Sequence, residues 1–195
     1  MSGGDLSSAS DRVLARRAGL GDNQAFAELF NRLFVPTLRY ALHMLDGDEQ
    51  LAEDALQDAW IKAWRGLAKF QGQSAVQTWL FTIVAHEVRD VRRRKRPIVV
   101  DNTLLEPLAR KASASASVSA SVDPPQVLLQ HELLDALKLA LSELPSMQRA
   151  CWLLREIEEF SYDKIARILD TTPGVVRGQL HRARRDLAIR MEQWR

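Results

Sequence analysis

The stretch Ser161-Tyr-Asp-Lys-Ile-Ala-Arg-Ile-Leu-Asp-Thr-Thr-Pro173 decides the fold of the C-terminal part of this chain. Its periodicity predicts a short helix, a tight turn at Asp170-Thr171 and then a second helix. Thr172 supplies a hydroxyl for the N-cap of the second helix, and Pro173 suits its first position. A residue larger than Ala166 would push the two helices apart. The stretch therefore predicts a helix-turn-helix.

The second helix, predicted over residues 173–191, has two distinct faces. The residues expected in its buried stripe lie within about 60° of one another, and they are Val176, Leu180, Ala183 and Leu187. The opposite face and its flank carry Gly174, Arg177, Gly178, His181, Arg182, Arg184 and Arg185. A helix of this kind fits the DNA major groove, where Arg pairs with guanine or contacts phosphate. The pattern favours DNA binding over a merely solvated basic face.

Helical periodicity also dominates the rest of the chain. It is clearest in residues 50–67, where one face carries Ala52, Leu56, Ala59, Trp60, Ala63, Trp64 and Leu67. Further helices are predicted over residues 24–45 with an interruption at Pro36, and over 78–94, 127–141, 147–156 and 162–169. No stretch alternates apolar and polar residues for long enough to predict a strand. The fold class is therefore all-α.

The segment from Lys111 to Pro125 divides the chain in two. It consists mainly of alternating Ala and Ser, lacks large side chains and ends in two prolines. The alternative, a solvent-exposed Ala-rich helix, is disfavoured by the serines. We expect two small helical domains, residues 1–100 and 127–195, joined by a flexible linker over residues 101–126.

Composition limits the class of protein. The chain has 195 residues, 46% of them hydrophobic, and a net charge of only +2, which excludes a disordered chain and a polybasic coat. Residues 1–10 lack a signal-peptide pattern, and the longest apolar stretch, around residues 79–85, is too short to span a membrane. The single cysteine, Cys151, excludes a disulfide framework and fits a cytoplasmic protein. Beside Trp152 it is expected to be a core residue rather than a redox sensor.

Charges in the N-terminal part are segregated by sign. An acidic belt consists of Asp46, Asp48, Glu49, Glu53, Asp54 and Asp58. A basic run consists of Arg89, Arg92, Arg93, Arg94, Lys95 and Arg96. A solvated face explains either set alone, but the two together indicate different partners, namely a basic protein surface and a polyanion.

A glycine-containing loop with flanking aromatic residues lies between these charged sets. It belongs to the stretch Lys69-Phe-Gln-Gly-Gln-Ser-Ala-Val-Gln-Thr-Trp-Leu-Phe81. Aromatic rings beside cationic side chains suit single-stranded nucleic acid, because bases stack on them. Phe81 is interpreted instead as a core residue.

Several short motifs occur in a fixed order along the chain. In the N-terminal part they are Gly21-Asp-Asn-Gln-Ala-Phe26, Ala52-Glu-Asp-Ala-Leu-Gln-Asp-Ala-Trp60, Phe70-Gln-Gly-Gln-Ser74 and Thr78-Trp-Leu-Phe-Thr-Ile83. In the C-terminal part they are Leu144-Pro-Ser-Met-Gln-Arg149, Ser161-Tyr-Asp-Lys-Ile-Ala166 and Leu180-His-Arg-Ala-Arg184. In this order and spacing the chain resembles the extracytoplasmic-function (group 4) sigma factors of bacterial RNA polymerase, with regions 2 and 4 on either side of the linker.

The resemblance implies a role for each surface. Core RNA polymerase would bind, through its β′ clamp coiled coil, to Glu53, Asp54, Gln57 and Asp58. The promoter −10 element would be captured and melted by Phe70, Gln71, Gly72, Ser74, Trp79, His86, Asp90, Arg93 and Arg94. The −35 element would be contacted by Arg155, Thr172, Arg177, Gly178, His181, Arg182 and Arg185. The resemblance also implies contact with the β flap, a linker that threads the polymerase channels, and an anti-sigma factor that holds the protein inactive.

The chain departs from the family pattern at several positions. The family usually has Asn where His86 stands, and Thr, Ser and Arg where Val175, Gly178 and Gln179 stand. We therefore expect altered −10 and −35 preferences. The linker, often acidic in the family, is here rich in Ala and Ser.

Two other classes of protein fit the sequence less well. A helix-turn-helix regulator that acts without polymerase explains residues 161–187 but gives no role to the acidic belt or the aromatic loop. An enzyme is disfavoured because the four histidines are dispersed and no phosphate-binding loop or Cys/His ligand set is present. The pair Glu53 and Asp54 is better explained as a solvated face than as a carboxylate site. No catalytic residue, metal site or cofactor is predicted.

Overall fold

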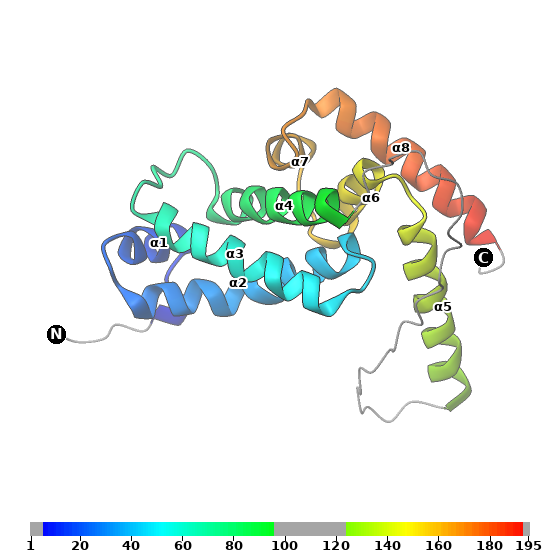
Figure 1. Cartoon of the computed structure of the whole chain (residues 1–195), viewed down its shortest axis with the longest axis horizontal. Coiled ribbons are helices and arrows are strands. Elements are labelled where there is room, and N and C mark those ends of the chain that lie inside the picture. The colour runs from blue at the N-terminus through cyan, green and yellow to red at the C-terminus, as the bar shows by residue number, and fades with distance from the viewer. Residues whose placement is uncertain (1–5, 96–123, 193–195) are drawn as a thin grey trace.

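The structure, a computed structural model, describes residues 6–95 and 124–192. Regular secondary structure within these ranges is helical throughout, which confirms the all-α prediction (Figure 1). The N-terminal unit comprises the short 3₁₀ turn η1 (Leu6–Ser8) and helices α1 (Asp11–Gly19), α2 (Asn23–Met44), α3 (Glu49–Leu67) and α4 (Val76–Lys95). The C-terminal unit comprises α5 (Pro124–Ser142), α6 (Ser146–Trp152), the π-helical segment η2 (Leu153–Ile157), α7 (Tyr162–Ile168) and α8 (Pro173–Arg190).

Side-chain caps fix where the N-terminal helices begin. The Asp22 carboxylate accepts hydrogen bonds from the backbone N–H groups of Gln24 and Ala25 at 3.0 and 3.1 Å. The pKa of Asp22 is lowered, most by the bond from Ala25, next by a hydrogen bond from Arg17, and least by the bond from Gln24. Asp48 caps α3 in the same way by accepting from the N–H of Leu51. Each cap satisfies backbone donors that have no partner within the helix.

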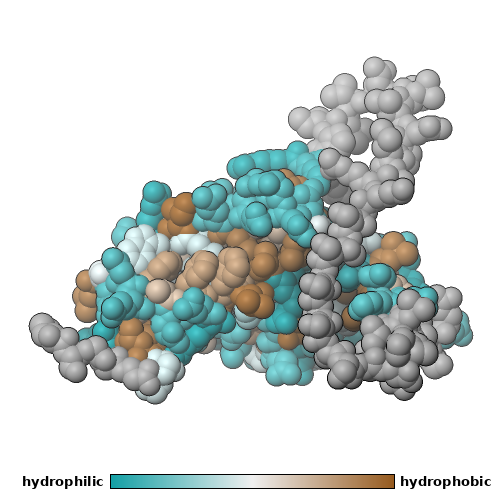
Figure 2. Space-filling view, turned by 90° about the horizontal axis from the view of Figure 1, so that it is seen from below, coloured by the Kyte–Doolittle hydropathy of each residue, from teal (hydrophilic) through white to brown (hydrophobic). Residues whose placement is uncertain are grey.

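Helix α3 lies between α2 and α4, and its apolar face is buried as predicted. The one exception is Trp64, whose exposed fraction is 38%. Its ring packs edge-on against Phe26 at 4.5 Å, and Trp60 packs against Phe30 at 4.8 Å. Phe26, Phe30 and Trp64 thus form a partly exposed aromatic strip beside the buried Trp60. Figure 2 shows that hydrophobic residues gather in a band on one face of the molecule.

The interruption predicted at Pro36, in the helix over residues 24–45, is wrong, because α2 continues through this proline. Proline has no N–H to donate to the preceding turn, which weakens a helix at that point. Here the hydroxyl of Thr37 donates to the carbonyl of Leu33 at 2.7 Å and contacts that of Phe34 at 2.9 Å. Burial of Leu33, Thr37 and Tyr40 on both sides of the proline stabilises the continuous helix.

Helix α1 was not predicted from the sequence. It buries Leu14, Ala15 and Ala18 against α2 and α3. This face is short and consists mostly of alanine, so its periodicity is weak.

The C-terminal unit contains the predicted helix-turn-helix. Helix α7 ends at a turn in which Asp170 has a positive φ of 50°, and α8 begins directly after Thr172. The Thr172 hydroxyl accepts from the N–H of Val175 at 3.3 Å, which confirms it as the N-cap. Helix α5 begins at Pro124, so the last three residues of the linker predicted over 101–126 belong to a helix, while residues 101–123 lie outside the described residues.

The two units pack against each other, with α7 in contact with α4 (Figure 1). Phe81 is fully buried and packs edge-on against Tyr40 within its own unit and Phe160 of the other unit, at 5.8 and 5.0 Å. The prediction that Phe81 is a core residue is confirmed. Arg149 of α6 is also fully buried, although it carries a charge.

Candidate nucleic-acid interface

Helix α8 presents a basic face to solvent. Its inward face is made by Val176, Leu180, Ala183 and Leu187, all buried as predicted. The residues left exposed include the predicted −35 contacts Thr172, Arg177, His181, Arg182 and Arg185. Gly178 is half-buried beneath the Arg182 guanidinium, since a Cβ at this position would lie 3.7 Å from one of its nitrogens. The helix therefore offers cations on the side away from the core.

Several arginines of this unit have partners within the protein, among them Arg155 and Arg184, which the sequence analysis placed toward DNA. Arg155 donates to the carbonyl of Phe160 at 3.0 Å and lies over the ring of Tyr162 at 5.4 Å from its centroid. Arg184, placed on the DNA-facing flank by the sequence analysis, instead forms an ion pair with Glu156 at 2.6 Å. These contacts hold η2, α7 and α8 together.

The loop between α3 and α4 brings aromatic and small residues together. The rings of Phe70 and Trp79 lie 5.0 Å apart, and both are half-buried. Gly72 has a positive φ of 71°, which residues other than glycine rarely adopt. Gln71 is exposed and accepts a hydrogen bond from Gln73, whereas Ser74 is half-buried. The loop therefore combines an aromatic pair with a glycine in the left-handed conformation.

The remaining predicted −10 residues lie on α4, but they do not all share one face. Trp79, His86, Asp90 and Arg93 recur at helical spacing on one side. Asp90 pairs with Arg93 at 3.4 Å, and Nε2 of His86 is buried without a hydrogen-bond partner among the described residues. Arg94 instead lines a groove between α3 and α4.

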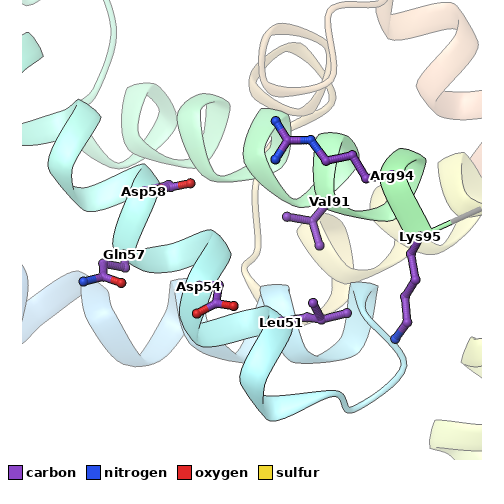
Figure 3. Close-up of a pocket in the computed structure, with 7 residues that line it drawn as sticks. All are labelled: Leu51, Asp54, Gln57, Asp58, Val91, Arg94 and Lys95. Carbon is purple, nitrogen blue, oxygen red and sulfur yellow. The ribbon is translucent and has the colours of Figure 1, made fainter.

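The groove between α3 and α4 joins the acidic and basic sets (Figure 3). Its α3 side carries Asp54, Gln57 and Asp58, which are three of the four predicted polymerase contacts. Its α4 side carries Val91, Arg94 and Lys95, and Leu51 completes the lining. Glu53, the fourth predicted contact, is exposed on the neighbouring surface of α3. Two members of the acidic belt, Asp54 and Asp58, and two of the basic run, Arg94 and Lys95, therefore meet in one mixed-charge groove.

Two members of the acidic belt have structural roles. Asp48 pairs with Lys95 at 2.8 Å in addition to capping α3. Asp46 accepts from Arg149 at 2.5 Å. The acidic surface that remains available is centred on Glu53, Asp54 and Asp58, all of which are exposed.

The contact between the two units contains polar residues that the sequence analysis missed. Arg149 donates to the carbonyl of His43 at 3.1 Å as well as to Asp46, and to the carbonyl of Ser142 within its own unit. Arg39 donates to Glu158 at 2.8 Å. No local signal reveals these pairs, because the partners of Arg149 in α2 and the following turn are more than 100 residues away in sequence.

Burial at this contact shifts two pKa values. The pKa of His43 is lowered, chiefly by desolvation and further by the nearby cations Lys138, Arg39 and Arg149. Desolvation raises the pKa of Glu158, against the opposing effect of Arg39. The contact therefore favours the neutral form of His43.

The described residues contain no group of three or more His, Cys, Asp or Glu side chains arranged to hold a metal ion. None of the described helices is both long and apolar enough to cross a membrane.

Comparison with known proteins places both units in one family. Residues 14–98 match Sigma-70 region 2, and residues 134–187 match Sigma-70 region 4. The chain is 32% identical over 179 residues to the ECF RNA polymerase sigma-E factor of Escherichia coli, covering 90% of this chain and 91% of that protein. It is 31% identical over 181 residues to the RNA polymerase sigma-H factor of Pseudomonas aeruginosa, covering 92% of each.

Two solved structures share the fold. CnrH, determined in complex with the cytosolic domain of CnrY, matches with a TM-score of 0.67 and 23% identity, over 94% of this chain and 97% of that one. The sigma factor RpoE of Bartonella quintana, determined in complex with the anti-sigma factor NepR, matches with a TM-score of 0.63 and 25% identity, over 86% of this chain and 96% of that one.

Proposed function

The chain belongs to the extracytoplasmic-function sigma factors of the sigma-70 family, and we propose that each surface described above serves one step of promoter-specific transcription initiation. The observation that carries this proposal is the presence, in one chain, of the α3 groove, the aromatic loop before α4 and the basic recognition helix α8. Sigma factors as a family are transcription initiation factors that bind core RNA polymerase and promoter DNA. They are not enzymes, and we propose that this chain likewise has no catalytic activity of its own.

Core polymerase binding is assigned to Glu53, Asp54, Gln57 and Asp58. All four side chains are exposed on α3, and three line the groove. An acidic surface beside the apolar residues Leu51 and Val91 suits a basic helical partner such as the β′ clamp coiled coil. Contact with the β flap is assigned to the C-terminal unit.

The −10 element is assigned to the aromatic loop and the adjoining face of α4. A flipped base would stack against the ring pair of Phe70 and Trp79, and such stacking contributes about 1–3 kcal/mol per base. Capture of unstacked bases offsets the few kcal/mol needed to unstack them, so strand opening requires no hydrolysis. His86, with its unpartnered buried nitrogen, stands where the family usually has Asn and is expected to change the base preference.

The −35 element is assigned to α8, where Arg177, His181 and Arg182 are exposed together. Val175 and Gly178 shorten the side chains at the groove compared with the family pattern. Gly178 also allows Arg182 to lie close against the helix backbone. We expect the arginines to carry more of the recognition than in relatives with longer side chains at these positions.

The packed arrangement of the two units must open for both elements to be bound together. Positions −10 and −35 are about 25 base pairs apart, or about 85 Å at 3.4 Å per base pair. Here α4 and α7 are in direct contact, and α8, which follows α7, is only about 27 Å long. In this arrangement the −10 surface on α4 and the −35 surface on α8 cannot lie about 85 Å apart. Because the two units belong to one chain, binding of the first element makes the second DNA contact intramolecular.

Regulation is assigned to an anti-sigma factor. Two structural relatives were determined with such partners or with a cytosolic domain bound, and we propose that this chain is likewise held inactive by a protein that covers both units. Its action with polymerase places it in the cytoplasm.

A reconstituted transcription assay tests the proposal. Core polymerase with the chain would be presented with a library of duplexes randomised around positions −10 and −35, and the transcribed templates sequenced. The expected result is enrichment of one defined −10 element together with one defined −35 element. This enrichment should be lost when Arg177 and Arg182 are changed to Ala. Transcription without enrichment at either element would contradict it.

A further inference from the structure

Helix α1 lies beside the loop that we assign to base capture, and one of its arginines contacts that loop. A Cβ built on Gly72 would be 3.4 Å from Nε and 3.5 Å from a terminal nitrogen of Arg12. The Arg12 guanidinium is therefore against the backbone of the loop at the residue where its φ is positive. Residue 12 and residue 72 are distant in sequence, so only the fold reveals this neighbour.

Arg12 and Arg16 are cations without an ion-pair partner among the described residues. Both are exposed on α1, one turn apart on the same side of the helix. Neither forms an ion pair with a carboxylate in residues 6–95 or 124–192, in contrast to Arg17, which pairs with Asp22 at 2.7 Å, and Arg32, which pairs with Asp11 and Glu28. Two positive charges without a partner in this part of the protein thus lie next to a loop with an aromatic wall.

We propose that Arg12, with Arg16 one turn further along, binds the phosphate backbone of the single strand whose base is captured by the Phe70–Ser74 loop. Single-strand sites combine aromatic stacking with cations that follow the backbone. The loop supplies Phe70 and Gly72, Trp79 of α4 completes the ring pair, and Arg12 supplies the adjacent charge. Phosphate contacts position a strand and carry no sequence information, so Arg12 fixes the register in which the loop and α4 meet the bases.

This proposal rests on the assignment of the loop to the −10 element, and the test separates the two. Holoenzyme would be assembled from core polymerase and the full chain. A labelled non-template strand of 12 nucleotides, selected by that holoenzyme from a randomised pool, serves as the probe. Failure of the wild-type holoenzyme to enrich any strand would contradict the loop assignment, whereas the proposal for Arg12 is judged on the variants.

The variant R12Q keeps a polar side chain beside Gly72 and removes the charge. Its dissociation constant is expected to rise, and its slope of log K against log salt to fall by about 0.7, the value for one contact to a single strand. R17Q is the matched control, since it removes the same charge from the same helix and is expected to leave the slope unchanged. R12Q/R16Q is expected to lose about 1.4.

A phosphate scan makes the test specific. Neutral methylphosphonates introduced one at a time should weaken binding by wild type at one or two positions, and R12Q should be insensitive at one of them. If R12Q binds more weakly but keeps both the wild-type slope and the wild-type scan, Arg12 supports the loop without touching the strand, and the proposal is wrong.

Discussion

The buried guanidinium of Arg149 and the carboxylate of Asp46 join the two units of this sigma factor at a distance of 2.5 Å. Arg149 is fully buried, while the side chain of Asp46 remains 58% exposed. Because the pair is open to water on one side, we expect it to stabilise the contact between the units only as much as a surface ion pair does, by about 1 kcal/mol or less. Such a pair biases the packed arrangement without locking it.

Removal of the Asp46 charge is expected to favour separation of the units. In D46N, Arg149 keeps the carbonyls of His43 and Ser142 but loses its carboxylate. A change of about 1 kcal/mol shifts the equilibrium between packed and separated forms by about fivefold. Fluorescence energy transfer between labels at exposed positions in α3 and α8 measures the shift.

The control for this variant is D58N, which removes a carboxylate on α3 away from the contact. Equal energy transfer in D46N and D58N would show that the Asp46 pair does not hold the units together.

Acidification should loosen the same contact through His43. Its pKa is lowered from the ordinary value of 6.5, so the separated state binds the proton more readily than the packed state. The stabilisation of the packed state by His43 is therefore complete above about pH 6.5, and it is lost as the pH falls through the lowered pKa of this histidine. Energy transfer should decrease between pH 7.5 and 5.5 in wild type and change less in H43Q.

Glu158, whose raised pKa also belongs to this contact, acts in the opposite direction, since its stabilisation is complete below pH 4.5 and is lost as pH rises. The difference between wild type and H43Q isolates the histidine. Identical pH profiles for the two proteins would contradict the role of His43.

Arg182 is expected to be a main −35 contact. Loss of a bidentate arginine pair reduces discrimination by about 1–3 kcal/mol, and loss of one duplex phosphate contact reduces the salt slope by about 0.9. Competition binding of R182A holoenzyme to matched and mismatched −35 duplexes distinguishes the two effects. R190A provides the comparison, because Arg190 pairs with Glu143 within the protein; a loss in R190A as large as in R182A would argue against the assignment.

Cys151 should be unreactive in the folded protein. It is fully buried, and burial raises the pKa of its thiol to about 12. The reactive thiolate is therefore scarce at pH 8. Iodoacetamide labelling followed by mass spectrometry is expected to show modification only after addition of urea, and rapid labelling of the native protein would contradict the burial.

The predictions from sequence succeeded where the relevant physics is local and periodic. The inward face of α8 followed from helical phase alone, and the Thr172 cap followed from its hydroxyl and the proline after it. The same reasoning gave the buried face of α3 except at Trp64, which is exposed because α2 covers only part of the ring.

The failures have physical causes of two kinds. Pro36 weakens its helix locally, but burial on both sides of it outweighs that loss. The contact between units depends on residues such as Arg39, Asp46 and Arg149, whose partners are distant in sequence. An exposed and a buried arginine have the same local pattern, so Arg149 and the neighbour of Gly72 could only be found from the fold.

Binding of the full chain to core RNA polymerase tests the central claim most directly. The variant E53K/D54K/D58K reverses the exposed charges of α3, and E132K/D135K/E192K, with the same net charge, reverses exposed acids of the C-terminal unit. We predict tight binding by wild type and by the control variant, and loss of binding by the α3 variant. Binding that survives in the α3 variant would contradict the assignment of this surface, and absence of binding by the wild-type chain, with duplex DNA still bound, would contradict its action as a sigma factor.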